Sequence, residues 1–84
     1  MDSNKIYELK LYPQYYKAIF SGEKTFELRK NDKDYQVGDI LKIREWDGEN
    51  FTGHSMMVRI SYVQKGNGKY GLSEGFCILG LKKR

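Results

Sequence analysis

Apolar and polar residues alternate along five segments of the chain, which is the pattern of half-buried β-strands. In the first segment, residues 6–11, Tyr7, Leu9 and Leu11 share one face and Lys10 lies on the other. The same alternation predicts further strands at residues 24–29, 40–46, 55–64 and 76–81, with residues 51–53 a possible start of the fourth.

The second strand carries a row of polar side chains. Alternation puts Phe26 and Leu28 on one face and Thr25, Glu27 and Arg29 on the opposite face. Because apolar side chains normally face the core, we expect Phe26 and Leu28 to point inward.

In the fourth strand four side chains, Met56, Val58, Ile60 and Tyr62, alternate with Met57, Arg59, Ser61 and Val63. We expect these four side chains to share one face of the sheet, because successive side chains of a strand point to opposite sides.

A short helix is predicted between the first two strands, at residues 13–21. Pro13 suits the first helical turn, Tyr16 and Ile19 recur at helical spacing, and Gly22 offers a left-handed C-terminal cap. The segment Asp-Gly-Glu-Asn at residues 47–50 is the sharpest hairpin signal in the chain.

These elements predict a single domain, residues 1–84, that is mainly β with one or two short helices. Twelve aromatic residues, nine glycines and a single proline agree with a chain of strands and tight turns. An 84-residue chain builds one modest core. We expect a small β-barrel, because closure removes the exposed edges of a sheet.

Composition narrows the classes of function. Fifteen Lys and Arg against eleven Asp and Glu give a net charge of +4, which favours polyanionic partners. His54 is the one histidine and Cys77 the one cysteine, so zinc sites and Ser-His-Asp chemistry lack their parts. We expect no metal and no cofactor.

The chain has no apolar run long enough for a membrane-spanning helix, and residues 1–5 lack the apolar stretch of a secretory signal. A single cysteine cannot form an internal disulfide. We therefore expect a cytoplasmic protein with no membrane association, and a monomer.

Residues 22–29 hold the strongest candidate for chemistry. Glu27 and Arg29 lie two apart on a strand and can contact one ligand from the same side, and Lys24 stands where the turn enters this strand. The alternative is a solvated strand with an incidental ion pair, worth roughly 0 to 1 kcal/mol. Spacing alone leaves both interpretations open.

The motif G-x-K-x-x-E-x-R at residues 22–29 resembles that of the ASCH domain of the PUA-like superfamily, in particular its small stand-alone bacterial and phage form of unassigned function. The segments Lys-Leu-Tyr-Pro at residues 10–13 and Val-Gly-Asp at residues 37–39 extend the similarity. The resemblance implies a PUA-like β-barrel whose cleft is lined by Lys24, Glu27 and Arg29, with RNA or a modified nucleoside as ligand.

Two residues of the first strand join this candidate ligand-binding set. Tyr7 stands where the small form commonly has histidine, and it can stack or hydrogen-bond although it is a poor base at neutral pH. Lys10 adds a positive charge. In the binding hypothesis Lys24 and Arg29 donate to phosphate or carbonyl oxygen, and Glu27 accepts from a base amino group.

Two other classes of function stay open. Some ASCH proteins are amidohydrolases that act on N4-acetylcytidine, and their resemblance makes Lys24 and Glu27 catalytic candidates. However, Glu27 stands where that branch has threonine, and the helical insertion that supplies its distant glutamate has no counterpart here. The other class is a phage or host protein-interaction module.

Several other residues have simpler interpretations. Tyr15 and Tyr16 occupy consecutive helical positions, so one of them is exposed and could stack on a base. Trp46 fits either a core position at the barrel edge or a stacking platform. We expect Cys77 to be a small buried hydrophobe and His54 an exposed bystander.

Overall fold

The computed structural model describes residues 4–84. Residues 1–3, on which part of the argument against a secretory signal depends, lie outside the described residues. The elements in chain order are β1 (Ile6–Leu11), α1 (Pro13–Ser21), β2 (Phe26–Lys30), β3 (Ile40–Trp46), β4 (Phe51–Lys65) and β5 (Phe76–Lys83).

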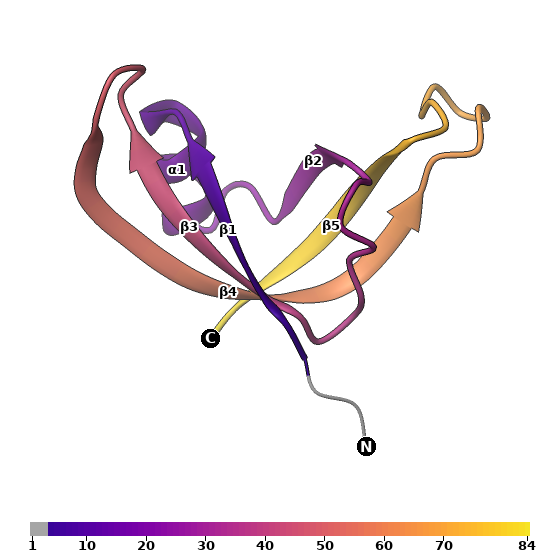
Figure 1. Ribbon diagram of the computed structural model, residues 1–84, viewed down its shortest axis with the longest axis horizontal. Helices are drawn as coiled ribbons and strands as arrows, with labels where there is room; N and C mark the ends of the chain where they lie inside the picture. Colours follow the sequence, from indigo (N-terminus) through magenta and orange to yellow (C-terminus); the bar gives the residue numbers. More distant parts are fainter. Residues whose placement is uncertain (1–3) are drawn as a thin grey trace.

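The five strands form one sheet in the order β1-β3-β4-β5-β2. β1 runs parallel to β3, and the other neighbouring pairs are antiparallel. Figure 1 shows the sheet curled into a V-shaped half-barrel, with the long β4 bent across both arms. The arm with β1 and β3 also carries α1, and the other arm holds β2 and β5.

The prediction of a mainly β fold with a short helix is confirmed. The expected closure is incomplete, because β1 and β2 are the two edges of the sheet and each pairs with one strand within residues 4–84. The concave side of the half-barrel is called the inner face below, and the convex side the outer face.

The hydrophobic core lies on the inner face. Leu41, Ile43, Ile60 and Leu79 are fully buried there. α1 adds Tyr16 and Ile19, which are also buried. The helix runs over the predicted residues and ends at Gly22, which has the left-handed φ of 89° and donates its N–H to Ile19 O at 3.1 Å.

Cys77 is buried in this core, as predicted. Burial raises the pKa of its thiol above the ordinary value, so the thiol stays protonated.

The expected face of Tyr62 is wrong. A β-bulge shifts the register between Ile60, which is opposite Leu81, and Tyr62, which is opposite Gly80. An extra residue reverses the alternation beyond it, so Val63 packs against the core while Tyr62 is 61% exposed. β4 is also a single strand that starts at Phe51.

The expected orientation of β2 is wrong as well. Its alternation is as predicted, but Phe26 and Leu28 are 46% and 54% exposed, whereas Glu27 is 5% exposed. The register with β5 is the reason, because Glu27 lies opposite Leu79 and Leu79 faces the core. The polar row of β2 therefore points to the inner face.

Candidate ligand-binding site

Lys24, Glu27 and Arg29 form one ionic cluster on the inner face. Glu27 Oε1 lies 3.2 Å from Lys24 Nζ, and Glu27 Oε2 lies 3.5 Å from Arg29 Nη1. The Glu27 side chain is 6% exposed, against 21% for Lys24 and 32% for Arg29. Two cations share one buried carboxylate, so the cluster carries an excess positive charge that solvent can reach.

The end of α1 fixes the position of Lys24. Its backbone N–H donates to Ala18 O at 2.9 Å, which ties the residue to the last turn of the helix. The Thr25 carbonyl then accepts from Leu81 N–H at 2.9 Å and starts the pairing with β5. The side chain of Lys24 is thus placed over β2, within reach of Glu27.

Tyr15 supplies an aromatic ring beside the cluster. Lys24 Nζ lies 4.9 Å from the centre of the Tyr15 ring. Tyr15 is 45% exposed and Tyr16 is buried, which confirms that one of these two tyrosines is exposed. An exposed ring next to a cation is the arrangement that stacks on bases.

Tyr35, in the loop between β2 and β3, closes the other end of the cluster. The residue is 2% exposed, and its ring packs edge to face with the Tyr7 ring, at 5.0 Å between ring centres. Tyr7 Oη donates to Lys33 O at 3.0 Å. Burial raises the pKa of Tyr35, and the positive charge of the nearby Arg29 guanidinium opposes that rise.

These contacts make one continuous line of side chains across the inner side of the domain. We call it the inner polar row; its members are Tyr7, Tyr35, Arg29, Glu27, Lys24 and Tyr15.

Lys10 is not part of this row. It lies on the outer face, with Nζ 3.9 Å from the centre of the Trp46 ring. Trp46 is half-buried there and also contacts Tyr12, at 5.6 Å between ring centres. The structure therefore brings together four of the five predicted contact residues and separates the fifth, Lys10. Lys24, Glu27 and Arg29 are in direct contact, and Tyr7 joins them by way of Tyr35.

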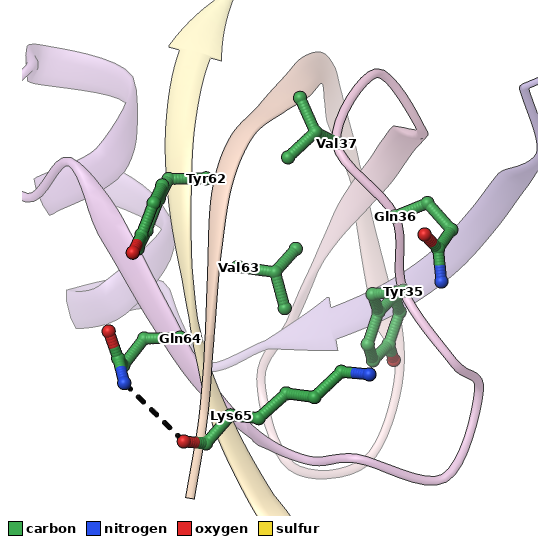
Figure 2. Close-up of a pocket in the computed structure, with 7 residues that line it drawn as sticks. All are labelled: Tyr35, Gln36, Val37, Tyr62, Val63, Gln64 and Lys65. Atoms are coloured by element: carbon green, nitrogen blue, oxygen red, sulfur yellow. Dashed lines mark hydrogen bonds between the residues drawn. The ribbon is translucent and has the colours of Figure 1, made fainter.

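Two of the hollows beside the inner polar row adjoin Tyr35 and Lys24, and a further one of about 460 Å³ adjoins Tyr7. Figure 2 shows the first, about 350 Å³, in which the Lys65 side chain extends toward Tyr35 and Val63 lies between them and Tyr62. The second, about 270 Å³, adjoins Lys24 and Thr25.

Sequence reasoning missed Tyr35 and Lys65. Tyr35 is a large aromatic residue in a mostly polar loop, and this pattern could have indicated a side chain that packs against the domain. Lys65 faces the inner side opposite Cys77 only because the bulge in β4 reverses the alternation, and simple periodicity does not show such a bulge.

Residues 4–84 contain no group of three or more His, Cys, Asp or Glu side chains placed to hold a metal ion. Their helix is too short and too polar to cross a membrane.

The chain matches the model of one known protein family. Residues 6–81 match the model of a domain of unknown function, DUF3850. The chain belongs to this family. The match includes all six residues of the inner polar row, so the row is a feature of this chain's DUF3850 domain.

A phage protein is similar over a large part of the chain. It is an uncharacterized 12.9 kDa protein in the GpA 3′ region of Escherichia phage P2, 41% identical over 59 residues. The aligned segment covers 70% of this chain and 54% of the phage protein, so the chain spans about half of that relative's length.

Proposed function

We propose that this DUF3850 domain binds single-stranded RNA or a nucleotide-like ligand along the inner polar row. The observation that carries the proposal is the inverted β2, which turns Glu27 and Arg29 to the concave side and leaves Phe26 and Leu28 in solvent.

The inversion is costly for a purely structural strand. Burying a carboxylate requires partners for its charge, and exposed Phe and Leu side chains forgo the stabilisation that burial gives, about 1.5 to 3 kcal/mol each when complete. Natural sequences break such local rules mainly at functional sites. The inner charges of β2 thus have a better explanation in ligand binding than in stability.

Four residues of the row have roles in binding that their chemistry allows. Arg29 and Lys24 are donors only and meet phosphate or carbonyl oxygens. Glu27 holds both cations in place and can accept from a base amino group. Tyr15 provides a ring on which a base stacks.

The resemblance of residues 22–29 to the ASCH motif supports the same ligand class and a PUA-like relationship of the half-barrel. An amidohydrolase acting on a modified nucleoside would use the same Lys24 and Glu27. In the structure Lys24 Nζ donates to Glu27 Oε1 at 3.2 Å, which fits an ammonium that binds and positions. Binding is therefore the function we favour.

A protein-interaction module is the second candidate, and one observation favours it. The outer face of the β2–β5 region exposes Phe26, Leu28, Tyr62 and Phe76. Leu28 lies opposite Ile78, and Phe26 and Tyr62 both lie opposite Gly80, so these side chains are neighbours. Contiguous exposed apolar surface is typical of protein contacts.

RNA binding should be weak and salt-dependent. Two or three phosphates contacted by Lys24, Arg29 and Lys65 give a slope of about −1.4 to −2.1 for log K against log salt, at about −0.7 per phosphate. Fluorescence anisotropy of a labelled single-stranded RNA, between about 50 and 200 mM salt, measures this slope. An affinity that does not change with salt would contradict the proposal.

A further inference from the structure

A separate hollow of about 660 Å³ lies between α1 and the β3–β4 hairpin. Figure 1 shows the helix beside this hairpin. Tyr16, Lys17, Phe20, Glu45 and His54 contribute to its lining, and none of them belongs to the inner polar row. The volume is in the range of small-molecule sites, about 300 to 1,000 Å³.

Glu45 gives this hollow a buried acceptor. The residue is 5% exposed, and its Oε1 accepts from Thr52 Oγ1 at 2.7 Å and lies 3.2 Å from His54 Nδ1. Within residues 4–84, Oε2 has no protein hydrogen-bond partner but is not sealed from solvent, so it is open to a ligand. A ligand N–H can therefore replace water at Oε2, and its hydrogen bond to the carboxylate is charge-assisted.

Aromatic rings form one wall. Phe20 is 59% exposed, and its ring lies nearly parallel to that of Tyr16, at 9° between planes and 6.3 Å between centres. Burial, followed by the negative charge of Glu45, raises the pKa of Tyr16, which keeps its hydroxyl protonated. A flat ligand can therefore lie against carbon surface while its edge meets polar groups.

The lining carries both signs of charge. Glu45 is an acceptor, whereas Lys17 is a donor only and His54 offers a ring nitrogen. A simple organic cation would satisfy Glu45 but would also meet the charge of Lys17. A neutral ring with an amino donor and a carbonyl acceptor on one edge satisfies both.

We propose that this hollow binds a nucleobase that carries both an amino and a carbonyl group, cytosine or guanine. The inference goes beyond RNA binding at the inner polar row, because it assigns a second site with base preference. It also gives a role to His54, which orients Glu45 from the hairpin side.

Isothermal titration with free nucleosides tests this assignment. Cytidine is compared with uridine, and guanosine with inosine, so that each pair differs at the amino group. We expect a preference of about tenfold for cytidine and guanosine, because their amino groups donate to Oε2. Uridine puts a carbonyl oxygen in place of the amino group, which repels the carboxylate, and inosine keeps its ring N–H but loses the amino donor.

The variant Glu45→Gln sharpens the test. Its amide oxygen can keep the bond from Thr52, while the amide N–H₂ now donates, so the preference should fall to about equal or reverse toward uridine. Glu49→Gln in the exposed hairpin turn is the matched control and should leave the preference unchanged. Phe20→Ala should lower the affinity for every nucleoside that binds. It should not unfold the domain, because Phe20 is at an exposed position.

Three outcomes would overturn the assignment. The first is equal affinity for cytidine and uridine in the wild-type protein, or no binding of either. The second is preferential binding of benzamidine, which would show a site for cations. The third is nucleoside binding that Arg29→Met abolishes and Glu45→Gln and Phe20→Ala leave intact, which would place the nucleoside at the inner polar row.

Discussion

Replacing Arg29 with methionine is expected to weaken the binding of single-stranded RNA by about tenfold or more. The guanidinium is half-buried on the inner face and offers several donors toward a phosphate. A hydrogen bond to a charged group is worth about 1.5 to 3 kcal/mol, which corresponds to this loss. Fluorescence anisotropy at low salt is the measurement.

The neighbouring Lys30 provides the matched control. Lys30 is exposed and points to the outer face, opposite Phe76, so Lys30→Met removes the same charge from the other side of the strand. We expect this variant to lose only about twofold in affinity, through the lower net charge. Equal losses in the two variants would show that net charge, and not the inner polar row, governs binding.

The largest effect on stability is expected for Tyr35→Ala, a loss of about 3 to 5 kcal/mol in the free energy of unfolding. Tyr35 is 2% exposed and fills the space between Tyr7 on β1 and Arg29 on β2. Within residues 4–84 these two strands are the edges of the half-barrel and do not pair with each other. Tyr35 therefore supplies packing between them that a closed barrel would obtain from strand pairing.

Urea denaturation monitored by circular dichroism measures this loss. A domain of 84 residues has about 4 to 13 kcal/mol in total, so Tyr35→Ala should lose a large share of its stability, and it is partly unfolded at room temperature only if the total is near the lower end of this range. Tyr35→Phe keeps the buried ring and should cost less than about 1 kcal/mol. A cost below about 1 kcal/mol for Tyr35→Ala would show that the loop does not hold the two edges together.

Periodicity predicted where the strands and the helix lie, but not always which way they face. Tyr7, Leu9 and Leu11 of β1 face the core as expected, because their apolar side is also the buried side. In β2 the buried side is the charged one, and only the pairing of Glu27 with Leu79 shows this. The bulge beyond Ile60 is likewise a property of the β4–β5 register.

The candidate sites also combine residues that the sequence indicates with residues that only the tertiary structure brings together. Lys24, Glu27 and Arg29 lie within one short motif, so the sequence brings them to attention together. Tyr35 reaches Arg29 through a loop, and Glu45 meets His54 across a hairpin. Contacts of this kind depend on tertiary structure, and spacing along the chain does not specify them.

Ligand binding at the inner face of β2 is the claim on which the proposed function rests, and an NMR titration of the ¹⁵N-labelled protein with single-stranded RNA tests it most directly. We predict that the largest amide shifts occur at Tyr15, at Lys24 and along residues 26–30, with smaller shifts at Lys65. Shifts confined to the outer face around Lys10 and Trp46, or no shifts at all, would contradict the claim.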